Sequence, residues 1–233
     1  MTKTNQQKVK DFLINNGVII VMFILVIYTG FTSDNFFTKN NFMNILMNMS
    51  SRLVIALGIA GCVITAGCDL SAGRMIGFGA CISGMLLQRM DYSGKFFPDM
   101  QPLNVFVVAL IAMLVCAAFG TVTGFFIAYL NVPPFIATLA MMEIVYGIGL
   151  IVTNATPLGG YVEQYTNVSN GKFLGINYLI WIAIIVAAIT WFIFNMTRHG
   201  KYMYAIGGNP QAAEVAGVPV KATLILIYMK AAA

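Results

Sequence analysis

The apolar part of this chain holds few polar side chains, and three of them, Asp69, Ser71 and Arg74, lie in the glycine-rich stretch Gly67–Gly79 between apolar runs. Asp69 and Ser71 are residue types that cap helices, and Arg74 stands five residues after Asp69. We expect Arg74 to pair with Asp69 across a turn or to face another polar partner. Non-helical backbone at membrane depth is tolerated only inside protein or beside water. The stretch therefore predicts either a tight cytoplasmic turn or a broken helix near a solute pathway.

Glu143 is a second isolated charge, and it stands inside a long apolar run. An intramembrane carboxylate is costly, so we expect it to face the helix bundle or a wet cavity. A structural hydrogen-bonding role and a role beside a solute pathway both stay open. A carrier driven by protons or sodium would more often show several such groups.

Sequence patterns for catalysis or nucleotide binding are absent. No nucleophile has a base at a suitable spacing, no metal-ligand spacing occurs, and the single histidine, His199, lies in a polar segment. Each Gly-Lys pair is followed by Phe or Tyr, and none has the upstream glycine of a P-loop. We therefore predict no enzyme activity, no cofactor and no metal. If ATP drives this protein, another subunit binds the ATP.

A short helix with clear end signals is predicted inside the polar, glycine-rich loop Arg198–Lys221. Asn209 is a good N-cap, and Pro210 suits the first helical position. Gln211–Ala216 would continue the helix, and Gly217 can take the left-handed conformation that ends it. A helix this short is marginal in water. Its surface is mostly alanine with one carboxylate, so it predicts a segment that inserts into a groove of a partner.

Composition identifies the class of protein. Of 233 residues, 59% are hydrophobic and only 9% are charged, with a net charge of +5, whereas soluble domains carry about 25% charged residues. We therefore predict an all-α, polytopic transmembrane helix bundle in which the whole chain, 1–233, is one domain. The four cysteines lie inside apolar runs and are expected to be buried thiols. The positive charge is explained by membrane topology and requires no nucleic acid.

Six apolar segments are expected to form spans: Phe12–Phe31, Leu53–Ala66, Met75–Leu87, Leu103–Leu130, Phe135–Thr153 and Tyr178–Phe194. A seventh begins at Ala222 but reaches only Met229, so we expect the natural protein to continue and this chain to be truncated at its C-terminus. The first span follows a polar start and no cleavage site follows it, which indicates an uncleaved helix.

Lysines before the first span, at positions 3, 8 and 10, predict a cytoplasmic N-terminus. Six crossings would return the chain to the cytoplasm at Arg198, whose loop is also basic. The outer loops would then be Thr32–Arg52, Gln88–Pro102 and Asn154–Asn177. On Lys and Arg alone the bias is weak, and the acidic residues of the outer loops strengthen it.

Small residues recur every fourth position along the fourth segment: Ala112, Cys116, Gly120, Gly124 and Ala128. Such a ridge lets a neighbouring helix approach closely. The neighbour is expected to be another helix of the same bundle, with a homodimer contact as the alternative. Pro133–Pro134 should then break the chain into a tight corner.

Three motifs resemble a known family. Gly67–Gly73, GCDLSAG, resembles the G-[IV]-DLS-[VA]-G segment of bacterial sugar permeases of the ribose/galactose ABC-importer family. Val132–Gly149 resembles that family's V-x-PFI-x-TL-x-M block. Gly200–Val218 resembles its AIGGN-containing coupling loop. The match runs over most of the chain in the same order, with Lys201 where arginine is common and Ala216 where serine is common.

The resemblance implies an inner-membrane sugar permease, of the galactose/methyl-galactoside type, with about ten helices in the full protein. The implied partners are a second permease copy, a cytoplasmic ATPase subunit and a periplasmic or lipid-anchored sugar-binding protein. The residues that match the ATPase-coupling loop, which would span 198–221, are Gly207, Gly208, Asn209, Pro210, Ala212, Ala213, Glu214 and Gly217.

Sugar recognition would need aromatic and polar groups near broken or mid-span positions. The candidates for the substrate pathway are Asp69, Ser71, Asn131, Glu143, Tyr146 and Asn154. Two alternatives stay open. One is a permease of the same architecture for ribose, another pentose, an autoinducer sugar, a nucleoside or a branched-chain amino acid. The other is a membrane scaffold that transports nothing.

Overall fold

Most of the chain is helical, as its apolar runs require, because backbone groups that enter lipid must find their hydrogen-bond partners within a helix. The computed structural model describes residues 5–233, with the side chains of residues 5–13 and 15 excepted. The chain divides into two compact units, with the boundary in the sequence between Asn48 and Met49. Lys3 lies outside the described residues and the side chains of Lys8 and Lys10 are not described, so the cytoplasmic N-terminus stays a prediction.

The first unit holds helix α1 (Asn5–Thr32) and the start of α2 (Lys39–Ile64). The turn between them is held by the Asn41 side chain, whose Nδ2 donates to the Phe36 carbonyl at 2.7 Å. The expected outer loop over Thr32–Arg52 is wrong, because the helix already begins at Lys39. Its first turns are rich in asparagine, but they propagate the helix that the following apolar run continues.

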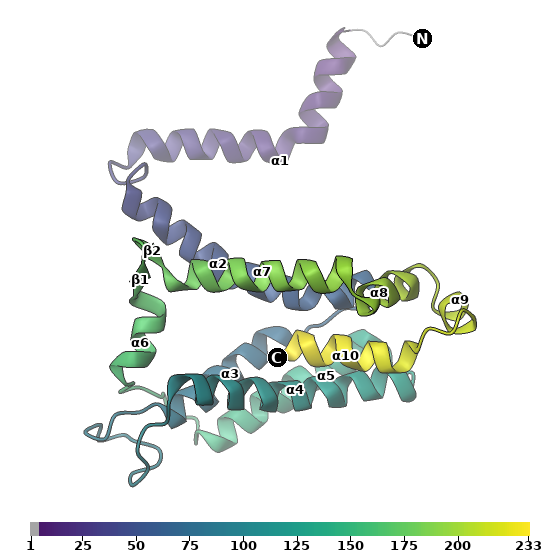
Figure 1. Ribbon diagram of the computed structural model, residues 1–233. Helices are drawn as coiled ribbons and strands as arrows, with labels where there is room; N and C mark the ends of the chain where they lie inside the picture. Colours follow the sequence, from purple (N-terminus) through teal and green to yellow (C-terminus); the bar gives the residue numbers. More distant parts are fainter. Residues whose placement is uncertain (1–4) are drawn as a thin grey trace. The chain divides into compact units, whose positions relative to one another are not determined.

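The second unit holds the remaining helices and a short hairpin (Figure 1): α3 (Ala72–Leu86), α4 (Val105–Tyr129), α5 (Pro134–Val152), α6 (Glu163–Asn170), β1 (Lys172–Phe173), β2 (Ile176–Asn177), α7 (Tyr178–Met196), α8 (Arg198–Gly208), α9 (Pro210–Val215) and α10 (Val220–Ala232). The strands pair antiparallel. Among the described residues, α2, α4, α5 and α7 are long and apolar enough to cross a membrane. Asn16–Thr32 and Ala72–Leu86 are apolar but shorter.

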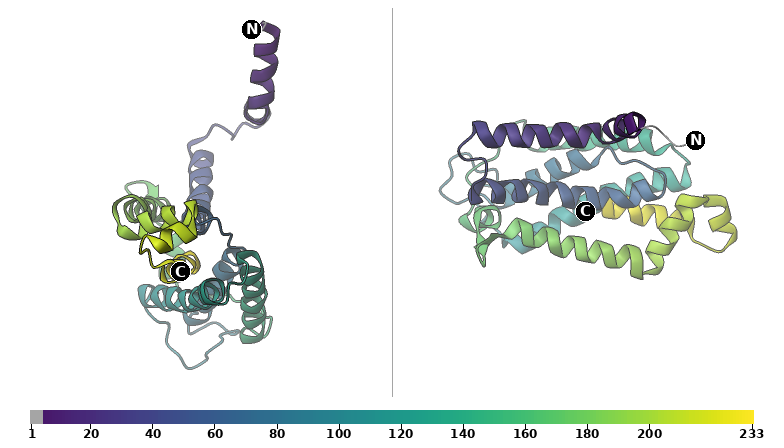
Figure 2. Two further views of the ribbon diagram at one scale, coloured as in Figure 1. Left: turned by 90° about the vertical axis from the view of Figure 1, so that its right-hand side faces the viewer. Right: turned by 90° about the horizontal axis from the view of Figure 1, so that it is seen from above.

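The core of the second unit lies around α4. Helices α3, α5 and α10 all pack against it, and Figure 2 shows this group of helices in two further views. The predicted ridge of small residues on α4 is confirmed as a buried packing surface inside the bundle. Its members face two neighbours, since Gly124 and Gly120 lie against α10 and Cys116 lies against α3.

The connections between helices follow their local sequence. The corner after α4 forms as predicted: Asn131 takes a left-handed φ of 51°, and α5 begins at Pro134. On the other side of the bundle Gln88, which is 1% exposed, donates to the Gly159 carbonyl and accepts from the Phe96 N–H. This side chain therefore ties together the loops that follow α3 and α5.

Candidate functional site

The predicted short helix near the C-terminus is confirmed as α9. The Asn209 side chain accepts a hydrogen bond from the Ala212 N–H at 3.0 Å, and Pro210 occupies the first turn. Gly217 has a φ of 82°, and the N–H of Val218 donates back to the Ala213 carbonyl at 3.0 Å. Both ends of the helix are therefore closed by the residues that the sequence indicated.

The predicted surface of α9, mostly alanine with one carboxylate, is only partly what the structure shows. Ala213 is buried, and it packs the helix onto the rest of the unit. Ala212 and Glu214 are exposed. Val215, which the sequence reasoning passed over, is 91% exposed, and it is the largest apolar side chain that α9 presents. Its signal in the sequence was a lone branched residue among alanines on a capped helix.

The helices on either side of α9 each contact a long helix: α8 contacts α2, and α10 contacts α4. The segment before it was predicted as a polar loop, and it is instead the helix α8, in which Met203 and Ile206 are buried. Gly207 of α8 lies so close to the Ile64 carbonyl of α2 that a methyl group there would clash. On the other side, Lys221 of α10 lies with its ammonium 5.1 Å from the ring centre of Tyr129 at the end of α4.

Asp69 and Ser71 hold the break between α2 and α3 together. The Asp69 carboxylate accepts hydrogen bonds from the Ser71 N–H at 2.8 Å and from the Ser71 hydroxyl at 2.6 Å, and both residues are buried. Tyr228 of α10 donates to the Cys68 carbonyl at 3.4 Å. Tyr228 lies well inside α10, so the break lies beside an interior turn of that helix. The tight cytoplasmic turn and the broken helix near a pathway therefore both stay predictions for this segment.

Arg74 does not pair with Asp69. Its guanidinium carbon lies 4.0 Å from the ring centre of Tyr146 on α5. The cause is the direction of the first turn of α3, which points Arg74 toward α5 while the Asp69 oxygen is used by Ser71. Tyr146 and Glu143 share a face of α5, since residues three apart are neighbours on a helix, and both are exposed in this chain. Glu143 therefore does not face the interior of its own bundle.

The other pathway candidates lie elsewhere. Asn131 is in the corner before α5, and Tyr146 lies about 18 Å further along that helix at 1.5 Å per residue. Asn154 follows the opposite end of α5 and also has a positive φ, of 50°. Both asparagines thus occupy left-handed turn positions, which Asn tolerates. The fold brings Tyr146 and Glu143 together with Arg74 and separates the two turn residues from them.

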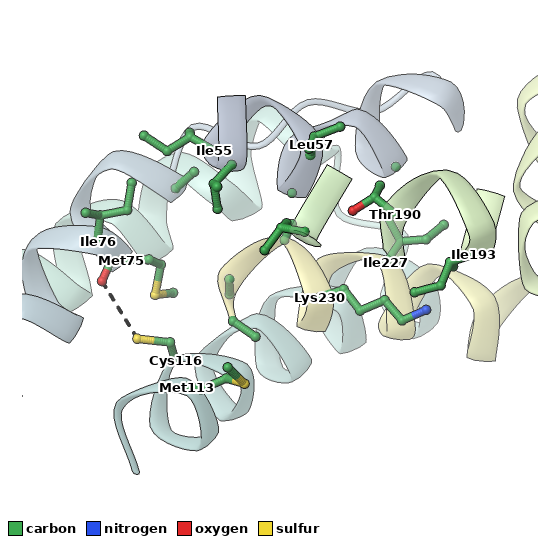
Figure 3. A pocket seen from close by; sticks show the side chains of 18 of the residues that line it. Ile55, Leu57, Met75, Ile76, Met113, Cys116, Thr190, Ile193, Ile227 and Lys230 are labelled. Atoms are coloured by element: carbon green, nitrogen blue, oxygen red, sulfur yellow. Dashed lines mark hydrogen bonds between the residues drawn. The ribbon is translucent and has the colours of Figure 1, made fainter. Parts of the chain in front are cut away.

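An apolar cavity of about 550 Å³ opens between α2, α3, α4, α7 and α10. Figure 3 shows aliphatic and sulfur-containing side chains around it, and the Cys116 thiol donates to the Met75 carbonyl at 3.7 Å. Its few polar lining groups include Thr190, His199 and Lys230. A sugar needs many hydrogen-bond partners, so this lining suits hydrocarbon far better than a sugar. Within residues 5–233, no group of His, Cys, Asp and Glu is arranged to hold a metal.

Long apolar helices, a helix break closed by the Asp69–Ser71 hydrogen bonds and a small exposed helix between two anchored helices are the features of a polytopic membrane protein. Residues 41–233 match the family described as branched-chain amino acid transport system / permease component, and the chain belongs to this family.

Individual relatives are more specific. The chain is 40% identical to the galactose/methyl galactoside import permease of Escherichia coli K12, over 98% of this chain and 70% of the relative. It is 41% identical to the protein of that name from Haemophilus influenzae, with the same two shares. It is 31% identical to the ribose import permease of Escherichia coli K12, over 94% of this chain and 66% of the relative. No solved structure matches significantly.

Proposed function

We propose that this chain is the membrane-spanning permease subunit of a binding-protein-dependent ABC importer for galactose and methyl galactoside, or glucose, in the inner membrane. The likeness to galactose/methyl galactoside permeases over nearly the whole chain supports the solute class. In this proposal two copies of the permease associate, a cytoplasmic ATPase subunit hydrolyses ATP, and a periplasmic or lipid-anchored protein delivers the sugar. The N-terminus and 198–221 face the cytoplasm.

The single observation that carries the proposal is the exposed helix α9. Six residues make a helix too short to be stable alone, yet α9 is capped at both ends and presents Val215 to solvent. An apolar side chain that is 91% exposed on such a helix fits a docking segment. The ATPase groove would receive Val215 and Ala212, and Glu214 would lie at its rim.

The contacts of α8 and α10 explain how a movement of α9 would be transmitted to the membrane-spanning helices. Gly207 holds α8 against the backbone of α2, and α10 lies along α4. When the ATPase subunits close on ATP, a groove that holds α9 would move both helix pairs together. The bundle would then change between outward-facing and inward-facing states, which is a two-state change biased by a ligand.

The test is a pair of changes on α9 in the permease, purified with its ATPase subunit and binding protein and reconstituted in vesicles. Glu214→Arg combined with Gly217→Pro should abolish galactose uptake and reduce co-purification of the ATPase, because the helix end and the docking surface are both altered. Lys172→Gln, in the exposed β hairpin, is the matched control and should leave both unchanged. Normal uptake and normal assembly in the α9 variant would refute the coupling role.

Ribose is the second candidate solute, because a ribose import permease is also similar over most of the chain. Competition by unlabelled ribose, another pentose, a nucleoside or a branched-chain amino acid against radiolabelled galactose separates these solutes. ATP hydrolysis that increases with the sugar-loaded binding protein would argue against a scaffold that transports nothing.

A further inference from the structure

Two charges lie on one exposed face of α3 and α5. Arg74 stacks over Tyr146 at 4.0 Å, Tyr146 is 41% exposed, and Glu143 lies one turn before it. Within the described part of the chain neither Arg74 nor Glu143 forms an ion pair. This face therefore offers a guanidinium, a carboxylate and part of an aromatic ring to whatever covers it.

This face lies beside the interior of a span. Tyr146 is about 18 Å from the start of α5 at 1.5 Å per residue, and the ring of Phe78, one turn beyond Arg74, approaches Gly149. A charged side chain at the centre of a membrane helix costs about 3 kcal/mol on insertion scales. Lipid is therefore a poor neighbour for Arg74 and Glu143, and the face needs water or polar groups against it.

The backbone around these side chains is bare. Gly73, Gly77 and Gly147 each have open space where a side chain would begin, because apart from their chain neighbours and the backbone of their own helix no atom lies within 4 Å. A ligand can therefore approach the helices closely. A sugar ring would find an aromatic surface for its C–H groups, five N–H donors on Arg74 and an acceptor on Glu143 for its hydroxyl groups. The apolar cavity on the other side of α3 offers no such set.

We propose that Arg74, held over Tyr146, contacts the sugar as it crosses the membrane, with Glu143 on the same wall of the pathway; this inference rests on the proposed function and adds Arg74 to its site. Arg74 donates to the sugar hydroxyls, and Tyr146 fixes the guanidinium by stacking. A second copy of the chain packed directly on this face is the competing arrangement, and the experiment separates the two.

The first experiment is thiol labelling of Gly77→Cys in the reconstituted importer, with a membrane-impermeant maleimide and the wild-type protein as background. The new thiol should react, and saturating galactose should slow the reaction several-fold. Ile184→Cys, on an exposed apolar face of α7, is the control and should stay unlabelled. A Gly77→Cys thiol that is unreactive, or that instead forms a disulfide between two copies, would overturn the proposal.

The second experiment measures galactose imported per ATP hydrolysed. Arg74→Gln should lower this ratio about tenfold, because hydrogen bonds to a charged group are lost, and Arg74→Lys should retain part of it. Arg89→Gln, in an exposed loop, is the matched control. All variants are first checked for assembly with the ATPase. If assembled Arg74→Gln shows a normal ratio of galactose imported to ATP hydrolysed while the wild type imports galactose, the role of Arg74 is refuted and the proposed function is not. A wild-type importer without galactose uptake refutes the proposed function, and this inference with it.

Discussion

Two pairs of glycines with the same spacing have opposite surroundings. Gly120 and Gly124 on α4 face α10 so closely that a methyl group on Gly124 would lie 2.7 Å from the Ile225 Cα. Gly73 and Gly77 on α3 face open space. The first pair lets two helices of one chain touch, and the second leaves bare backbone beside Arg74. The same pattern of small residues thus marks a filled contact in one place and an available surface in the other.

The largest expected effect comes from filling the closed contact. Gly124→Val should lower the free energy of unfolding by about 3 kcal/mol, because the Ile225 backbone cannot move aside without separating α4 from α10. Gly77→Val is the matched change on the open face, and it should stay within about 1 kcal/mol of wild type. Thermal unfolding of the purified protein in detergent measures both. Equal losses in the two variants would remove the distinction between the two faces.

Neighbouring glycines at the end of α8 give a sharper pair. Gly207→Ala should cost about 2 kcal/mol, because the added methyl group clashes with the Ile64 carbonyl. Gly208→Ala, one residue further along, meets no atom within 4 Å and should be nearly neutral. Unfolding in detergent again gives the stability, and co-purification of the ATPase tests whether a loosened α8 also loosens docking. Indistinguishable stability of the two variants would argue against the α8–α2 contact.

The cap of α9 is expected to have a smaller effect. Asn209→Ala removes the acceptor for the Ala212 N–H and should weaken the helix by about 1 kcal/mol, whereas Asn209→Asp keeps a capping oxygen. Hydrogen exchange of the α9 amides should become about fivefold faster in the alanine variant, as that free energy implies. Unchanged exchange would mean that contacts such as that of Ala213, and not the cap, hold this exposed helix.

His199, on α8, is expected to make stability depend on pH, and this is the last of the expected effects on stability. Burial, and then the charge of Lys230, lower the pKa of His199 below its ordinary value of 6.5. The fold therefore favours the neutral ring, so this stabilisation is complete above pH 6.5 and is lost as the pH falls through the lowered pKa. The loss should be about 1.4 kcal/mol per pKa unit. Melting temperatures from pH 7.5 to 5 should fall less for His199→Gln than for wild type, and parallel curves would contradict this.

Much of the local structure follows from local sequence. The caps at Asn209 and Gly217, the corner before Pro134 and the buried ridge on α4 all agree with prediction, because they depend on backbone preferences and on the size of side chains. The start of α2 and the helix α8 were mispredicted as loops. The helix α8 is polar in sequence but gains stability from packing, since Met203 and Ile206 are buried. The start of α2 has no buried residue and continues the apolar helix that follows it.

The candidate pathway was only partly predictable. Glu143 and Tyr146 are candidates because they lie in the middle of an apolar run, and Tyr146 does contact Arg74. Asp69 and Ser71 are candidates because they lie in the broken segment Gly67–Gly79, but they bond to each other inside the break. A residue type indicates that a polar group is present, whereas its partner depends on how the chain turns around it.

Composition and local pattern sufficed for the membrane class, for the apolar cores of the long helices and for the end signals of α9, since each depends on residues that are near one another along the chain. Folding alone assigned α10 to the glycines of α4, turned Arg74 from Asp69 to Tyr146 and exposed Val215. These outcomes join residues far apart in the sequence. They depend on which helix faces fit together, and no local pattern records that.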